Sequence, residues 1–423
     1  MRYVIFGFSS LGSKVAMKQG LKSLLRPTTL VMLVVVGVAA YFFEDNQRSI
    51  PFLYKIQLST HQLFSFLLPH KMGVQRVAVI EVDDEAFWNP PVSGIQPTNR
   101  VFLANLAKTA ADNGASAVAI DFQLKSPSGV VGDDPIRAAD NAYLLGKLRE
   151  IAQQGKPVIL SIGLKPEEHD WRREANIYAD NDLPMNLFLG HINIPLDHRQ
   201  IPLVMKGRED GKSRIKPYLS FAQAIAYSFE EKAHWNHKTK DDGRILRAQA
   251  HDEFVYGGFW PRREFLSISA AKLLTDKEEQ KLCNDRIVII GGTWHQYSKN
   301  TGPPVDSFDS PVGSIPGAYM HANYVEALLS SNFNPGLPRL AAIALDVLLA
   351  ALAYVGFRST NRKVVRRMLI IVMTLPMVLS YLLLANLGIY LDFTLALLLI
   401  SIHLFLEDQI ELRRKAKKEV AHA

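Results

Sequence analysis

The chain is poor in the residues and motifs that define several protein classes. Its 423 residues include one cysteine, Cys283, so no disulfide can form within the chain. Only 21% of the residues are charged and 48% are hydrophobic, which excludes an intrinsically disordered chain. A nucleophile elbow, a His-Glu-x-x-His zinc motif, a phosphate-binding loop and paired Cys ligands are all missing. The sequence therefore predicts no enzyme, no cofactor and no metal centre, and Cys283 is interpreted as buried packing.

The positive charge is confined to a few segments. The net charge is +7, but residues 1–27 alone carry five basic and no acidic residues. Residues 358–367 carry five more basic residues, and residues 407–423 carry five against four acidic ones. Each of these segments flanks an apolar run, which is typical of membrane orientation and not of nucleic-acid binding. We therefore expect the lipid bilayer as a partner and no nucleic acid.

Four apolar runs predict transmembrane helices, at residues 28–43, 340–357, 368–387 and 391–406. About 20 apolar residues cross a bilayer and about 17 are tolerated, so the first run is slightly short. Because basic segments stay in the cytoplasm, residues 1–27 and the tail 407–423 are predicted to lie inside. Residues 44–339 then lie outside, and residues 340–406 hold the last three helices. The chain is predicted to be a multi-pass protein of the bacterial inner membrane with a periplasmic main domain.

A cleaved signal peptide is the alternative for the first run. Val38 and Ala40 resemble the small residues that precede a cleavage site. However, the basic leader is long, and the run continues into the aromatic residues Tyr41, Phe42 and Phe43, which suit a membrane interface. The sequence therefore favours an uncleaved anchor.

The external segment alternates between strand and helix patterns. Residues 50–70 have helical apolar spacing and are predicted to form an amphipathic helix that leaves the membrane. Strands are predicted at 77–82, 117–124, 157–163 and 286–291, and helices at 100–113, 135–154, 218–229 and 318–330. A hairpin is expected at 191–203, a short helix at 268–274, and loops at 165–186 and 294–316. This order predicts an α/β domain with a mostly parallel sheet and helices on both faces.

Six motifs in this segment resemble those of one family. They are Val77–Asp84, Arg100, Gly114–Ala115 with Ala119–Phe122, Ile287–Gly291, Asp306–Pro311 and Pro316–Asn323. The six motifs occur in the family's order, and one predicted span precedes them and three follow. Residues 50–390 therefore resemble the type-two CHASE domain, an extracellular sensory module associated with cyclases and histidine kinases. Residues 96–99 and 197–201 depart from the family pattern. Family members often continue into an output domain, for which the tail 407–423 is too short. The resemblance therefore implies a sensor that relays to a separate membrane or cytoplasmic effector protein, and a homo-oligomer is compatible with it.

Polar residues follow several predicted strands. Ligands bind beyond the carboxyl ends of strands in open α/β sheets, so these residues predict a site for a small ligand. The candidate ligand-binding residues are Asp83, Asp84, Arg100, Asp121, Thr293, His295 and His321. The structural alternative is that Asp83 and Asp121 cap helices and bind loop amides, and that His321 is a satisfied core histidine.

One carboxylate falls inside a predicted span. Asp346 lies about eight residues into the second apolar run, and so about 12 Å deep. A charge there costs about 2.5–3.5 kcal/mol unless it is paired or faces protein. We predict an intramembrane polar contact with another helix or subunit, with His403 and Asn386 as possible partners. Snorkelling to the outer interface is the alternative.

Three functional classes fit these features. The first is a membrane sensor without catalytic output. The second is a structural or assembly subunit of a cell-envelope complex that uses the external domain as a docking face. The third is a periplasmic hydrolase that uses the Asp/His residues at the strand ends.

Overall fold

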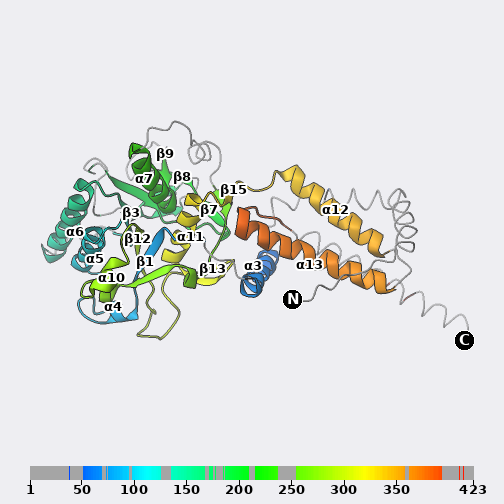
Figure 1. The fold of residues 1–423 in the computed structure, drawn as a ribbon, viewed down its shortest axis with the longest axis horizontal. Coiled ribbons are helices and arrows are strands. Elements are labelled where there is room, and N and C mark those ends of the chain that lie inside the picture. The colour runs from blue at the N-terminus through cyan, green and yellow to red at the C-terminus, as the bar shows by residue number, and fades with distance from the viewer. Residues whose placement is uncertain are drawn as a thin grey trace, which may run out of the picture. The chain divides into compact units, whose positions relative to one another are not determined.

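The computed structural model describes residue 38 and residues 51–68, 73, 75–94, 98–124, 135–166, 171–174, 177, 184, 186–208, 215–236, 254–357, 362–392, 409 and 413. The chain divides into two units (Figure 1). We call the first the helical unit; it comprises Met1–Phe64, Gly336–Leu383 and Tyr390–Ala423. We call the second the sheet domain; it comprises Ser65–Pro335 and Leu384–Ile389.

The sheet domain is built on a six-stranded sheet in the order β11-β1-β12-β2-β3-β6. Every neighbouring pair in this sheet is parallel. The strands are β1 (Val77–Val82), β2 (Ala117–Asp121), β3 (Val158–Ile162), β6 (Leu187–His191), β11 (Leu266–Ser269) and β12 (Ile287–Gly292). Most are runs of Val, Ile, Leu and Ala, because a parallel sheet is buried on both faces. The predicted α/β class with a mostly parallel sheet is confirmed.

Helices cover both faces of this sheet. On one face, α5 (Arg100–Asp112), α6 (Pro135–Gln153) and α9 (Ala270–Leu273) pack on side chains such as Ile80 and Ile120. On the other face, α7 (Phe221–Asn236) and α11 (Gly317–Leu329) pack on side chains such as Val79 and Ile289. The two faces alternate because successive strand residues point to opposite sides. Three short helices lie in the connections: α4 (Asp84–Trp88), η3 (Arg262–Glu264) and α10 (Lys277–Lys281).

The described part of the sheet domain also contains three smaller sheets. One has the order β4 (Leu164–Pro166), β5 (Trp171–Arg173), β8 (Val204–Arg208) and β9 (Ile215–Leu219). Another has the order β15 (Phe333–Asn334), β10 (Phe254–Gly257) and β7 (Gln200–Pro202), and the third is the hairpin of β13 (Ser307–Ser310) and β14 (Gly313–Pro316).

The structure differs from the sequence prediction in two segments of this domain. The predicted hairpin at 191–203 is wrong, because β6 pairs with β3 in the central sheet and β7 pairs with β10 in another. The predicted short helix at 268–274 is confirmed as α9 over Ala270–Leu273, but its first two residues belong to β11, an edge strand that pairs with β1 and was not predicted. Both partners are distant in sequence, so local apolar alternation does not reveal them.

The helical unit contains α3 (Pro51–Leu67, apart from its last residues), α12 (Arg339–Phe357) and most of α13 (Arg362–Leu387). In the described part of the chain, one helical segment, Ile370–Leu387, is long and apolar enough to cross a membrane. Leu340–Leu352 in α12 is a shorter apolar helix. The predicted second and third spans are therefore helices, while crossing of the membrane stays a prediction for both. The predicted first span, apart from Val38, and nearly all of the fourth lie outside the described residues.

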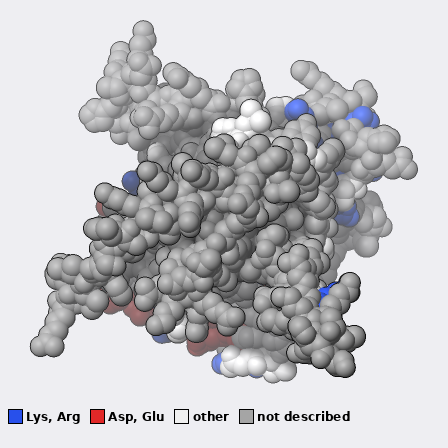
Figure 2. Space-filling model, turned by 90° about the vertical axis from the view of Figure 1, so that its right-hand side faces the viewer, with Lys and Arg blue, Asp and Glu red and all other residues white. Residues whose placement is uncertain are grey.

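Figure 2 shows one face of the molecule with its charged residues coloured. On this face the Lys and Arg atoms of the described residues lie in small separate groups, and the Asp and Glu atoms gather towards the lower edge.

Candidate functional site

Several polar residues lie side by side at the carboxyl ends of the central strands. The strand register aligns Ser269 of β11 with Glu81 of β1, Glu81 with Gly291 of β12, and Gly291 with Asp121 of β2. Glu81 and Asp121 lie two residues after Val79 and Ala119, so they point to the same face, on which α11 packs. Two carboxylates therefore flank Gly291 on the side of α11.

Gly291 lets α11 approach the sheet. A Cβ atom at Gly291 would lie 2.4 Å from the Cβ of Ala318, in the first turn of α11. The N-terminal turn of α11 thus fills the space above the strand ends at Glu81, Gly291 and Asp121. The sequence predicted a ligand in that space.

Asp121 and His321 come together beneath this turn. His321 Nε2 lies 3.8 Å from Asp121 Oδ1, and their side chains are 3% and 5% exposed. Burial, with repulsion from Asp306, raises the pKa of Asp121 well above its usual value. Burial, with repulsion from His191, lowers the pKa of His321 to about 3. Both effects favour the neutral forms, so the pair is a neutral contact in the domain core.

Asp84 and His295 form a second pair. Asp84 accepts hydrogen bonds from His295 N at 2.7 Å, His295 Nδ1 at 2.7 Å and Asn300 N at 2.9 Å. Burial raises the pKa of Asp84, but these hydrogen bonds and the charge of His295 outweigh burial, and the net pKa is lowered. The carboxylate fastens the loop after β12 to the start of α4.

Aromatic rings occupy the space next to this second pair. Trp294 stacks on Phe87 of α4, with ring centroids 4.0 Å apart and planes within 5°. A Cβ atom at Gly292 would lie 2.3 Å from the Trp294 ring. This end of the sheet is therefore packed by the chain's own side chains.

The other predicted ligand residues have local roles. Asp83 caps α4 by accepting a hydrogen bond from Ala86 N at 2.9 Å, as the structural alternative predicts. Burial, the largest effect, raises its pKa. Arg100 begins α5, is buried, and donates to Thr98 O at 3.5 Å. Thr293 donates its backbone N–H to Val82 O at 2.9 Å. Among the described residues, no contact joins the Asp121–His321 pair to the Asp84–His295 pair, so the predicted set is not one constellation.

Sequence analysis missed a polar cluster on Glu81. Arg262 Nε donates to Glu81 Oε1 at 3.0 Å, the Tyr319 hydroxyl also donates to Oε1, and the guanidinium carbon lies 5.2 Å from the Tyr319 ring centre. Burial and the Glu81 carboxylate raise the pKa of Tyr319. A carboxylate inside the apolar run Val77–Val82 was the signal that could have revealed this cluster.

His191 was also missed. It ends β6, is fully buried, and burial lowers its pKa to about 3. In the described part of the chain, neither of its ring nitrogens has a hydrogen-bond partner. It acts on His321 electrostatically, so both histidines belong to the neutral cluster beneath α11.

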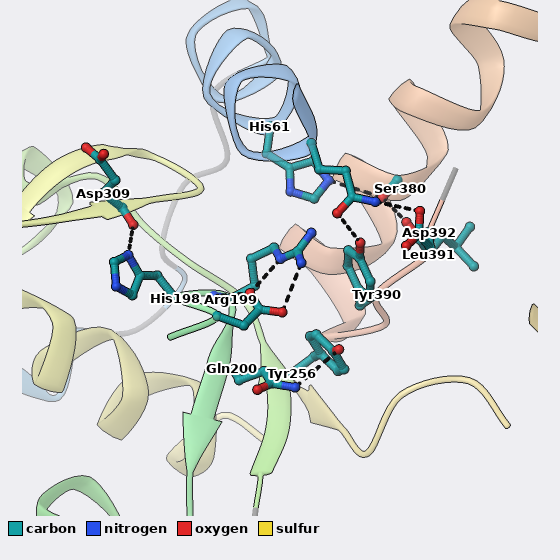
Figure 3. A network of polar contacts seen from close by, with 12 residues as sticks. His61, His198, Arg199, Gln200, Tyr256, Asp309, Ser380, Tyr390, Leu391 and Asp392 are labelled. Carbon is teal, nitrogen blue, oxygen red and sulfur yellow. Dashed lines mark hydrogen bonds and ion pairs between the residues drawn. The ribbon is translucent and has the colours of Figure 1, made fainter. Parts of the chain in front are cut away.

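Residues 197–201, which depart from the family pattern, are held by an ion pair and hydrogen bonds. Arg199 forms a two-point ion pair with Asp197, through Nε to Oδ1 at 2.7 Å and Nη2 to Oδ2 at 2.9 Å. His198 Nδ1 donates to Asp309 O, and Gln200 Nε2 donates to the Tyr256 hydroxyl at 3.3 Å (Figure 3). The stretch forms a turn, closed by a hydrogen bond from Gln200 N to Asp197 O at 2.9 Å and held by the ion pair.

The helical unit holds a separate polar cluster. His61 Nε2 lies 3.1 Å from Ser380 Oγ, and Gln57 contacts both Tyr390 and Asp392 (Figure 3). Asp346 in α12 is 2% exposed, and the intramembrane polar contact predicted for it stays a prediction. Its predicted partner His403 lies outside the described residues.

These arrangements favour structural roles over chemistry. Among the described residues, no three His, Cys, Asp or Glu side chains are placed to hold a metal ion. Cys283 is buried, and burial raises the pKa of its thiol to about 11, which makes it a poor nucleophile.

Comparison with known proteins identifies the family of the chain. The sequence model of the CHASE2 domain matches residues 31–357, which is most of the chain. No curated protein and no solved structure matches the chain significantly. The match covers β1 to α11 and includes all the strand ends described above. CHASE2 domains are extracytoplasmic sensory domains, and this chain belongs to the CHASE2 domain family.

Proposed function

We propose that this protein is an integral membrane sensor whose sheet domain lies outside the cytoplasm and relays its state to a separate protein. The proposal rests on one observation about α13. This helix contains an apolar segment long enough to cross a membrane, and its last residues belong to the sheet domain. The proposal assigns no catalytic turnover to the chain.

The exposed side chains of α13 support membrane integration. Only 35% of the window Ile370–Leu387 is buried, whereas the core helix of a soluble protein would be mostly buried. Six of its exposed residues are large and apolar, namely Ile370, Ile371, Leu375, Leu379, Leu382 and Leu387, whereas Thr374 and Asn386 are exposed polar residues. Such a surface is stable against lipid and not against water.

The end of α13 supports a relay. Residues Leu384–Ile389 belong to the sheet domain, where Asn332 Nδ2 donates to Ala385 O at 3.0 Å. Gly388 has φ +63°, and a Cβ atom there would lie 2.5 Å from Phe333 Cα. Phe333 begins β15, so a rearrangement of the small sheet that contains β15 would move the last turn of this helix.

Reporter fusions test the topology. Alkaline phosphatase, which is active only outside the cytoplasm, is fused after Lys165, after Arg362 or after Ala423, and green fluorescent protein replaces it in a matched set. We expect phosphatase activity only at Lys165 and fluorescence only at Arg362 and Ala423, because the basic segments stay inside. Fluorescence at Lys165 would overturn the proposal.

Deletion of Arg413–Ala423 tests the relay. Ten basic residues remain in the other two predicted inner segments, so insertion should survive. A partner that docks on the basic tail should be recovered in smaller amounts by affinity purification in mild detergent. A matched control exchanges Arg and Lys within residues 413–418, which keeps the charge. If the deleted chain inserts and still recovers every partner of the full chain, docking on the tail is wrong.

An assembly subunit is the second candidate, because the strand-end sites are filled by the chain's own side chains. A stoichiometric complex that persists whatever the state of the sheet domain would favour this role over sensing.

A further inference from the structure

Helix α3 buries a stripe of polar side chains and exposes several large apolar ones. Gln57, His61 and Ser65 follow one another at intervals of four residues and are 2%, 0% and 5% exposed. They therefore form one buried stripe along the helix. Large apolar residues are instead exposed: Phe52 at 65%, Leu63 at 53%, Phe66 at 77%, Leu67 at 56% and Leu68 at 43%.

The buried stripe is held by hydrogen bonds to α13. Ser380 Oγ donates its hydrogen to Leu391 O at 2.6 Å. The hydroxyl has one hydrogen, so it accepts from His61 Nε2, which lies 3.1 Å away and carries a hydrogen. His61 and Ser380 are both 0% exposed, so neither can exchange this bond for one with water.

Gln57 extends the contact by one helical turn. The Tyr390 hydroxyl donates to Gln57 Oε1 at 2.6 Å, and Gln57 Nε2 donates to Asp392 Oδ1 at 2.5 Å. The amide thus satisfies a carboxylate in the segment after α13. Hydrogen bonds between buried polar side chains of this kind are what a low-dielectric surrounding requires.

These contacts fix the depth of α3. Ser380 lies seven residues before Leu387, the end of the apolar window of α13. At 1.5 Å per residue, Ser380 is about 10 Å inside that end. If α13 crosses the bilayer, the residue of α3 that bonds to Ser380 must lie at the same depth, and an interfacial helix is immersed by about 5–10 Å.

We propose that α3 lies within the outer leaflet of the bilayer, with Phe52, Leu63, Phe66, Leu67 and Leu68 against the acyl chains. This inference rests on the proposed membrane integration of α13, and it changes the predicted role of residues 50–70 from a helix that leaves the membrane to one embedded in it. Helices α3 and α13, which the His61–Ser380 bond joins, both expose large apolar side chains. Lys55, the exposed cation of this helix, has a stem long enough to reach the headgroups.

Site-specific labelling of the full chain in vesicles tests the proposal. Leu63→Cys and Phe66→Cys replace exposed side chains, so the fold should tolerate them. Native Cys283 is buried with its thiol pKa raised to about 11, so background labelling is low. An environment-sensitive fluorophore is attached, and quenching is compared between lipids brominated along the acyl chains and iodide in the water. Lys277→Cys, exposed on α10, is the aqueous control, and Leu379→Cys on α13 is the membrane control.

The expected result is at least twofold stronger quenching by brominated lipid at Leu63→Cys and Phe66→Cys than at Lys277→Cys. In parallel, iodide should quench the fluorophore at Lys277→Cys but not the fluorophore at either α3 site. If Leu379→Cys is quenched by lipid but the α3 sites are quenched by iodide, the inference about α3 is wrong and α13 still spans. If all the sites respond to iodide, membrane integration itself is wrong.

A second copy of the chain is the other occupant of this face. Energy transfer between α3 sites on differently labelled copies, at low protein-to-lipid ratio and without quenching by brominated lipid, would show that protein covers the face and would overturn the proposal.

Discussion

The sheet domain and the helical unit differ in where they place large apolar side chains. In the sheet domain, Val79, Ile120 and Ile289 are 0% exposed. In the helical unit, His61 and Ser380 are 0% exposed, whereas Leu340 and Leu348 are 78% and 54% exposed. The helical unit thus exposes large apolar residue types that form the core of the sheet domain. If α13 crosses a bilayer, as proposed above, hydrocarbon surrounds these side chains and favours their exposure.

The two units also use polar groups differently. In the sheet domain, buried carboxylates such as Glu326 satisfy the backbone: Glu326 Oε1 accepts from Arg76 N at 2.5 Å and Val77 N at 2.7 Å. In the helical unit, polar side chains join one segment to another, as His61 does with Ser380. Polar groups complete the sheet in one unit and hold helices together in the other.

The largest expected effect comes from the close packing of the sheet domain. Gly291→Val places a branched side chain where even a Cβ atom lies 2.4 Å from Ala318 Cβ, so α11 must leave the sheet. We expect a loss of about 4 kcal/mol in the free energy of unfolding. Denaturation of the full chain in detergent, followed by tryptophan fluorescence, measures it. Gly146→Ala is the control, because no atom lies within 4 Å of a Cβ there and a helical alanine should stabilise by about 0.5–1 kcal/mol. An equal response of the two variants would contradict the packing argument.

A charge placed on an exposed leucine tests the contrast between the units directly. Leu379 on α13 is 41% exposed and Leu196 in the sheet domain is 97% exposed. Leu379→Lys should cost about 3 kcal/mol in a membrane-insertion assay, because it faces hydrocarbon near the centre of the apolar window. Leu196→Lys should change stability by less than about 0.5 kcal/mol, because it faces water. If both substitutions are neutral, the exposed surface of α13 does not face lipid.

The sequence was sufficient for the fold class because the central strands are apolar runs separated by helices at regular intervals. β1, β2, β3 and β12 were predicted within a few residues, since parallel strands buried on both faces leave a strong local signal. β6 and β11 were not recognised, because an edge strand carries less apolar sequence and its partner lies far along the chain.

The candidate site was predicted only in part. The pairs Asp84–His295 and Asp121–His321 were both within the predicted set, because residues that end parallel strands share one edge. The sequence did not predict that these two pairs form separate sites, since this depends on α11 filling the space above Gly291. The partners of α3 were not predictable either, because a stripe of Gln57, His61 and Ser65 looks like a solvated face until the solvent is known.

Acidification should weaken the sheet domain through its buried histidines. Burial lowers the pKa values of His191 and His321 to about 3. Below about pH 6.5 the unfolded chain binds protons that the folded chain does not, so stability falls as pH falls towards 3, by about 1.4 kcal/mol per pH unit for each histidine. The raised pKa of Asp121 acts in the opposite direction, because its stabilising effect is present at low pH and lost as pH rises.

Melting temperatures of the full chain between pH 4.5 and 7 measure this balance. His191→Asn should flatten the dependence by removing one titrating group, and Asp121→Asn should steepen it by removing the opposing one. If neither variant changes the slope of melting temperature against pH, His191 and Asp121 do not control the pH dependence of stability.

The smallest expected effect is the coupling between His61 and Ser380. Polar pairs between membrane helices contribute only about 0.6 kcal/mol on average, because the unfolded chain in lipid also finds partners. We expect this coupling from a double-mutant cycle of His61→Ala, Ser380→Ala and the double variant, measured by unfolding in bicelles. The matched cycle in the sheet domain uses Asp84→Ala and His295→Ala, where Asp84 accepts both the side-chain and backbone bonds of His295. That coupling should be larger, about 1.5–3 kcal/mol, because one partner is charged. A larger coupling for His61 and Ser380 would mean that the helical unit holds α3 mainly by polar contacts. The expected small value means instead that the apolar face of α3 must be stabilised by what surrounds it.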